Sequence, residues 1–186
     1  GLNATAIFTP KQIGQISDAV QLLGLGAAAA GRLGVLMNVT GKSTDQINKN
    51  VTDSVRSFNA QNKAAIAPRQ VLDDILTTSE DVSLALGNSV PALAKAASAA
   101  RKLGMSLAQV DAIADSLMDF ESSIQNELEA QLLTGKNINM AKARELALNN
   151  DLAGLASELA NSGVTAAEYS KMNRIQQEAL AKSLGM

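Results

Sequence analysis

The amino-acid sequence predicts an all-α protein on three observations. Helix start and stop signals recur along the chain, apolar residues between them are spaced three or four apart, and no segment alternates long enough to pair as a strand. Of the 186 residues, 46% are apolar and 18% are charged, which is typical of a folded chain rather than an acid-rich disordered one. We therefore expect a bundle-like set of short to medium helices.

The helix starts are capping boxes, in which a Ser or Thr and a Gln or Glu three residues later bond each other's backbone N–H groups. They occur at Thr9, Ser43, Ser106 and Thr165. Pro10 occupies a first helical position, where a missing N–H group costs nothing. The stops are glycines that can take the left-handed cap conformation, namely Gly24, Gly41, Gly87, Gly104, Gly135, Gly163 and Gly185.

Taken in chain order, these signals divide the sequence into helices. The first lies between Thr9 and Gly24, the second ends before Gly41, and the third begins at the Ser43 box. A loop then leads to shorter helices, and Ile138 to Met140 is a short stretch with extended character. The predicted helices span 10–23, 26–39, 44–63, 69–77, 79–87, 90–103, 107–134, 140–149, 151–162 and 166–184.

The helix predicted over 107–134 carries the clearest apolar stripe, which continues for about seven turns. Its members are Val110, Ile113, Leu117, Phe120, Ile124, Leu128 and Leu132. This helix and the one over 166–184 are expected to supply most of the apolar packing. A domain boundary is predicted near Pro91, with an irregular, Ala- and Gly-rich helical segment over 1–90 and a compact helical domain over 91–186.

Composition argues against most kinds of functional site. The chain has no His, Cys or Trp, which removes thiol and imidazole chemistry, the corresponding metal ligands and disulfides. Its net charge of −2 and its few aromatic residues disfavour nucleic-acid binding. We expect no enzymatic activity, catalytic residue, metal, cofactor or small-molecule substrate.

The most apolar segment, Leu22–Val39, has two interpretations. It is nearly long enough to enter a membrane, but Arg32, Asn38 and several glycines interrupt it. The alternative is a close-packed helix in a core or an oligomer interface, where Gly24, Ala28 and Gly31 would allow another helix to approach. The second interpretation is favoured.

Carboxylates gather between Leu103 and Gly135, a stretch without Lys or Arg. Asp111, Asp115 and Asp119 are spaced four apart on one helical face. Carboxylate oxygens can bind Ca²⁺ or Mg²⁺, but one straight helix surrounds an ion poorly. A solvated face is favoured, or one docked on a basic surface; the candidate basic residues are Lys95, Arg101 and Lys102.

Other charged or glycine-rich features are weaker signals. The run from Gly24 to Ala29 and the triplet Thr134–Lys136 only loosely resemble phosphate-binding loops. Basic residues recur on the later helices, where a solvated face is favoured over a basic docking stripe. They are Lys142, Arg144, Lys171, Arg174 and Lys182.

The motif Leu184-Gly185-Met186 repeats Leu103-Gly104-Met105, which leads directly into another predicted helix. We therefore expect the sequence to be a piece of a longer polypeptide.

From residue 90 onward the sequence resembles the helical repeats of bacteriophage tail tape-measure proteins and related tail-core proteins. The resemblance is carried by Lys102–Ser106, Phe120–Ala130, Leu133–Arg144, Leu152–Ala156 and Met172–Lys182. It covers about half of the chain and contains no peptidase or lysozyme motif.

The resemblance implies a non-enzymatic structural protein in the lumen of a phage tail, which helps to set tail length and leaves ahead of the genome. It implies homo-oligomers, contacts with tail tube, tail tip or baseplate hub proteins, host-membrane contact at ejection, and residence in the host cytoplasm during assembly. A ruler should be a long uninterrupted helix, whereas this chain has frequent caps, which suggests a folded region near one end. The alternative is a membrane-perturbing effector or helical adaptor that uses residues 22–39.

Overall fold

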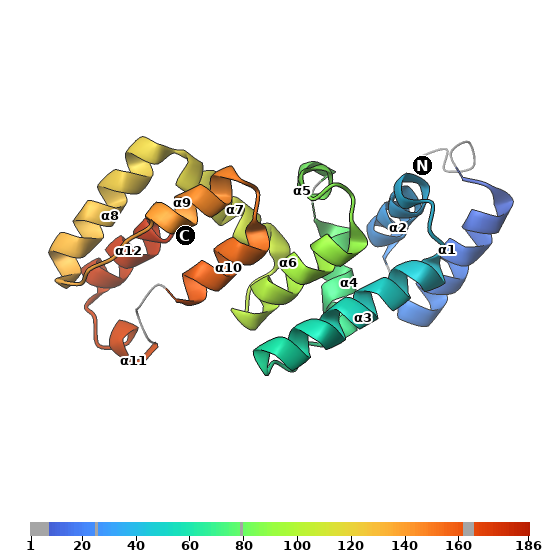
Figure 1. The fold of residues 1–186 in the computed structure, drawn as a ribbon, viewed down its shortest axis with the longest axis horizontal. Helices are drawn as coiled ribbons and strands as arrows, with labels where there is room; N and C mark the ends of the chain where they lie inside the picture. Colours follow the sequence, from blue (N-terminus) through green and yellow to red (C-terminus); the bar gives the residue numbers. More distant parts are fainter. Residues whose placement is uncertain (1–7, 25, 79, 162–165) are drawn as a thin grey trace. The chain divides into compact units, whose positions relative to one another are not determined.

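A computed structural model describes residues 8–24, 26–78, 80–161 and 166–186. All regular structure in this part of the chain is helical, which confirms the predicted fold class. The helices fall into two compact units, and the chain passes from one to the other between Lys102 and Leu103 (Figure 1). Each unit has its own core and is described separately.

The first unit contains the helices up to Lys102. They are α1 (Pro10–Leu23), α2 (Ala27–Thr40), α3 (Thr44–Asn62), α4 (Pro68–Thr77), α5 (Glu80–Ala85) and α6 (Val90–Lys102). Its core is built on α6, which packs against α3 and α4. Ile47, Val51 and Val55 form one fully buried face of α3, while α6 buries mostly alanines. These small side chains allow the neighbouring helices to approach closely.

A buried ion pair joins α4 to α6. Both Nε and Nη2 of Arg101 donate hydrogen bonds of 2.6 Å to the two carboxylate oxygens of Asp74. The Asp74 side chain is 3% exposed. Burial raises the pKa of Asp74 above its ordinary value, and the hydrogen bonds from Arg101 act against that rise. This bidentate pair fixes the register between the two helices.

The division between the units differs from the predicted boundary near Pro91. Because α6 packs on α3 and α4, residues 90–102 belong to the first unit. The chain leaves that unit through Gly104, whose φ of +78° suits glycine. The sequence pattern changes at Pro91, but the contacts change only after Lys102.

The second unit contains the remaining helices. They are α7 (Leu107–Met118), α8 (Phe120–Thr134), α9 (Ala141–Leu148), α10 (Leu152–Ala160), α11 (Ala166–Tyr169) and α12 (Arg174–Ser183). The buried face of α7 packs against α9 and α10, and α8 lies beside α12 (Figure 1). Ile138 and Met140, in the non-helical segment before α9, are almost completely buried.

The helix predicted over 107–134 is two helices, because Asp119 ends α7 and caps α8. The backbone of Asp119 leaves the helical region with a ψ of 82°. Its carboxylate accepts a hydrogen bond from the Ser122 N–H group. Hydrogen bonds from Ser122 lower the pKa of Asp119. An Asp at this position satisfies the first N–H groups of a new helix, so the predicted continuous stripe is wrong.

The helix predicted over 166–184 is also interrupted. Its first turn is α11, and Asn173 then starts α12 with a capping box closed by Gln176. The predicted boxes at Thr9, Ser43 and Ser106 are present. Thr165 and Gly163 lie outside the described residues.

Candidate interaction surfaces

Helix α8 carries its large apolar side chains on the solvent side. Phe120, Ile124, Leu128 and Leu132 are 44%, 46%, 55% and 85% exposed, respectively. The residues that α8 buries are Ser123 and Ala130. We call the four exposed side chains the α8 ridge. A surface helix ordinarily turns its apolar stripe inward, so this orientation is the reverse of the expected one.

Polar contacts hold α8 in this orientation. Arg144 on α9 places Nη2 2.7 Å from the Glu127 carboxylate, and its Nη1 donates a 3.1 Å hydrogen bond to Ser123. Both charged side chains are only about 12% exposed. Gln176 on α12 donates to the Leu133 carbonyl at 2.8 Å. Turning the ridge inward would break these contacts and strand a nearly buried charge, which is costly.

A shallow groove runs along α8 next to the ridge. One side is formed by Ile124, Leu128 and Leu132, and the other by Glu121, Gln125 and Glu129. Each set is spaced four residues apart, so the two sets form adjacent parallel rows on the helix surface. The surface therefore presents an apolar row beside an acidic one, which is the shape that receives a row of side chains from another helix.

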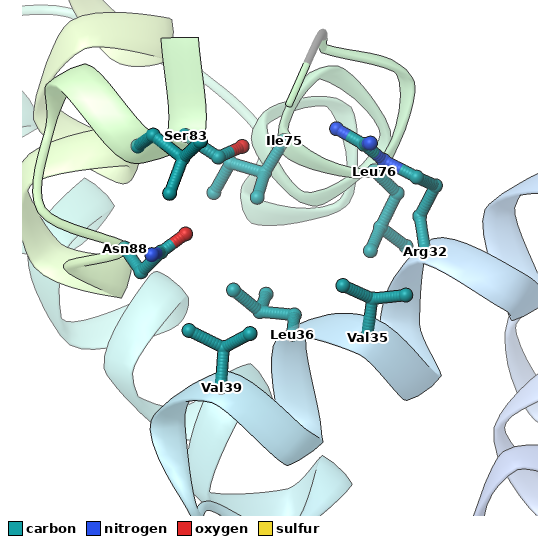
Figure 2. A pocket seen from close by; sticks show the side chains of 9 residues that line it. Arg32, Val35, Leu36, Val39, Ile75, Leu76, Ser83 and Asn88 are labelled. Atoms are coloured by element: carbon teal, nitrogen blue, oxygen red, sulfur yellow. The ribbon is translucent and has the colours of Figure 1, made fainter. Parts of the chain in front are cut away.

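A second surface feature lies in the first unit, where α2, α4 and the residues after α4 enclose a notch of about 160 Å³ (Figure 2). Side chains from α2 and α4 form an apolar wall, and polar side chains lie at its rim. The lining residues are Val35, Leu36, Val39, Ile75, Leu76 and Leu84, with Arg32, Ser83 and Asn88.

Polar residues at the rim of this notch are held in place, and apolar side chains beside them are exposed. Arg32 donates a hydrogen bond to the Thr78 carbonyl at the end of α4. Asn88 has a φ of +52°, a left-handed conformation that Asn tolerates better than most residues. Val35, Val39 and Leu84 are 41%, 54% and 63% exposed. The notch can receive one apolar side chain of a partner.

The apolar segment Leu22–Val39 is divided between two helices. Its first residues end α1, Gly24 caps that helix in the left-handed conformation, and Gly26 precedes α2. Within the described part of the chain, no helix has the length and hydropathy needed to cross a bilayer.

Within the chain, the close contact of α2 is made at Gly34 and not at Gly24, Ala28 or Gly31. Gly24, Ala28 and Gly31 are exposed. Gly34 is buried instead, and a Cβ atom placed there would lie 2.5 Å from the ring of Phe8. The close contact in α2 is therefore to an aromatic ring, in a register three residues later than Gly31.

The carboxylates of α7 and its neighbours do not assemble into a metal site. Among the described residues no group of three potential acidic ligands lies close enough to hold an ion. Asp119 acts as a helix cap, while Asp111 and Asp115 lie on α7 at intermediate and exposed positions.

The basic residues of the second unit have different environments. Lys142 pairs with Glu145 and Lys182 with Glu178 on exposed helix faces, where such pairs contribute little. Arg144 is nearly buried, whereas Lys171 and Arg174 are exposed. Arg144 therefore does not contribute to an exposed basic stripe.

In the first unit, two of the three candidate docking residues have contacts within the unit. Arg101 pairs with Asp74, and Lys102 donates to Asn62 at 3.4 Å. Lys95 is exposed. The surface considered as a counterpart for the acidic helix is therefore partly occupied.

The two glycine-containing runs considered as phosphate loops are helix ends. Gly24 caps α1, Gly26 precedes α2, and Gly135 caps α8 with a φ of +66°. Lys136, which follows, pairs with Glu168.

Both surfaces were missed by sequence reasoning, for different reasons. The α8 ridge was predicted as part of one stripe on a continuous helix that supplies apolar packing, although Asp119 and Ser122 already form a helix-start pattern within it. The notch combines residues from 32 to 88, and no local pattern predicts that juxtaposition. Comparison with protein-family models, curated proteins and solved structures finds no match for this chain.

Proposed function

We propose that this chain is a folded, non-enzymatic segment of a phage tail tape measure protein, which resides in the tail lumen and docks on neighbouring tail components. The resemblance over residues 90–186 supports the family. A docking role is supported by the α8 ridge. Its four large apolar side chains face solvent, while the opposite side of the helix is held by the ion pair between Glu127 and Arg144. Surfaces of this kind mark sites of protein association.

The energy available from the ridge suits assembly. Covering half-exposed Leu, Ile and Phe side chains contributes about 1 kcal/mol each. Association costs at least about 4 kcal/mol in lost translational and rotational freedom. The ridge alone therefore supports weak binding, and stable docking would need further contacts or the high local concentration inside a tail.

The short helices favour a folded end region over the extended ruler itself. The longest described helix, α3, has 19 residues and spans roughly 28 Å. A tail-length ruler requires much longer continuous helix. We therefore propose that this segment anchors or initiates assembly, and that it is ejected with the rest of the protein.

Immunodetection in purified virus particles tests this proposal. An antibody against the chain should detect a polypeptide far heavier than 19.3 kDa in tails before genome release, and its signal should be lost after release. A polypeptide near 19.3 kDa, or one that never occurs in tails, would overturn the proposal.

The notch favours one alternative function, a helical adaptor that uses the segment 22–39. Exposed Val35 and Val39 form one side of this notch, so a partner could insert an apolar side chain there. Under this alternative, Val39→Ser would abolish partner capture. Leakage of dye from liposomes incubated with the whole chain would instead favour a membrane-perturbing role.

A further inference from the structure

The side chains that line the groove on α8 indicate which kind of partner fits it. One side of the groove is an apolar row, and the other side is a polar row with Glu121 at one end and Glu129 at the other. Both carboxylates are exposed. A partner side chain that enters the groove therefore contacts hydrocarbon on one side and negative charge on the other.

The positive charge that would balance these carboxylates is not on the same helix. No Lys or Arg occurs between Leu103 and Gly135. Among the described residues, neither Glu121 nor Glu129 forms an ion pair. Lys136, just beyond α8, is paired with Glu168. A base on the molecule that covers the groove would complement them.

We propose that the α8 groove binds an amphipathic helix of another protein that carries Lys or Arg beside an apolar row. This inference deepens the proposed function and rests on it, since it names the partner class for the same surface. The partner's apolar row contacts Ile124, Leu128 and Leu132, and its basic row contacts Glu121 and Glu129. Packing of one helical row into the groove of another fixes the crossing of the two helices.

A second copy of α8 is a poorer occupant. In a two-fold antiparallel pair, the Glu121 and Glu129 rows of both copies would lie on the same flank, where like charges repel. In a parallel pair, the acidic row of each copy would face the side of the other copy that lacks the acidic row, and α8 has no Lys or Arg on any side. Neither arrangement provides a partner for the carboxylates.

The expected discrimination is modest because the charges are exposed. Exposed ion pairs contribute little individually, so two of them give a preference of about fivefold for a basic over a neutral flank. A partner helix with acidic residues beside its apolar row would be repelled, so the affinity difference between basic and acidic partners is larger still. The preference should decrease as salt increases, because the pairs lie within reach of screening ions.

Two designed helical peptides of equal length test the inference by fluorescence anisotropy with the whole chain. Both carry the same leucine row; one has lysines beside it and the other has glutamates. The lysine peptide should bind at least about fivefold more tightly at low salt. The double variant Glu121→Gln/Glu129→Gln should largely remove this difference, and Leu128→Ser should weaken binding of both peptides.

Leu148→Ser is the matched control, because Leu148 is 56% exposed and Leu128 is 55% exposed. It should leave both affinities unchanged. Equal or tighter binding of the glutamate peptide would overturn the inference. So would dimerisation of the chain that Leu128→Ser abolishes in sedimentation experiments, since a second copy would then be the occupant.

The outcomes also separate this inference from the proposed function. Preferential binding of the lysine peptide by a chain that is absent from tails would leave the inference standing and overturn the tail assignment. A chain present in tails that does not distinguish the peptides would overturn the inference alone.

Discussion

Asp74 shows how a single buried charge constrains the first unit. Its carboxylate lies among apolar side chains of α4 and is compensated by two 2.6 Å hydrogen bonds from Arg101. Desolvation raises its pKa, and only the guanidinium opposes that rise. The intact pair therefore adds little to the free energy of unfolding, whereas removal of one partner alone is strongly destabilising.

Arg101→Met is expected to destabilise the first unit by about 3 kcal/mol at neutral pH, because it leaves the Asp74 carboxylate buried without a partner. The pKa of Asp74 should then rise further. Between the ordinary carboxyl pKa and this raised value, the native state holds a proton that the unfolded state lacks. Lowering the pH through that window therefore stabilises the variant, and its deficit against the wild type should shrink. Urea unfolding at several pH values measures this.

The control for that experiment is Asp74→Leu/Arg101→Met. Because it removes both charges together, its stability should be within about 1 kcal/mol of the wild type and show no comparable pH dependence. A deficit in Arg101→Met that is the same at every pH would contradict the proposed role of Asp74.

Asp119 offers a second test at the residue scale. Hydrogen bonds from Ser122 hold its pKa below the ordinary value. Its contribution to stability is therefore present above the unfolded-state pKa and is lost as the pH falls through the lower native pKa. In an NMR titration, Ser122→Ala should raise the pKa of Asp119 towards that of an ordinary aspartate. Because alanine keeps the backbone N–H group that donates to Asp119, an unchanged pKa would show that the Ser122 hydroxyl does not bind the carboxylate.

At the scale of elements, the junction between α7 and α8 divides the apolar stripe predicted over 107–134 into a buried part on α7 and an exposed part on α8. Leu117, at the end of α7, is 1% exposed, whereas Leu128 on α8 is 55% exposed. Both positions fit the same periodic pattern, which was predicted to supply apolar packing. The structure assigns Leu117 to the core and leaves Leu128 on the surface.

Leu117→Asp and Leu128→Asp should therefore behave differently. The first places a carboxylate in the core of the second unit and should unfold it, lowering the melting temperature sharply. The second should leave stability within about 0.5 kcal/mol of the wild type while preventing docking. Circular dichroism melts combined with the peptide-binding assay distinguish the two effects. A stable Leu117→Asp variant would contradict the assignment of that residue to the core.

At the scale of the whole molecule, each unit has the parts of an independent domain. The first has a core around α3, α4 and α6, and the second around α7, α9 and α10. Compact units with their own cores generally fold alone.

Residues 1–102 and 103–186, produced separately, should each show helical circular dichroism and one cooperative melting transition. A break at Pro91 instead should leave the first fragment unstable, because it removes α6 from α3 and α4. Cooperative folding of fragment 1–90 would contradict the observed division.

The sequence by itself determined the helical class and most helix ends. The boxes at Thr9, Ser43 and Ser106 involve groups three residues apart, so the residues that form them are visible in the sequence. Asp119 and Asn173 begin helices by the same local chemistry, although neither start was predicted. The resemblance to tail proteins is also a property of the sequence, and it remains a proposal.

Only the tertiary structure decided which helical faces are buried and which residues from distant helices meet. The apolar pattern of Ile124, Leu128 and Leu132 is compatible with either a core or an interface. Arg144 and α12 bind the other side of α8, which turns these residues outward. Periodicity shows which residues share one face of a helix, but it does not show what that face packs against. Burial depends on contacts between residues that are far apart in the sequence.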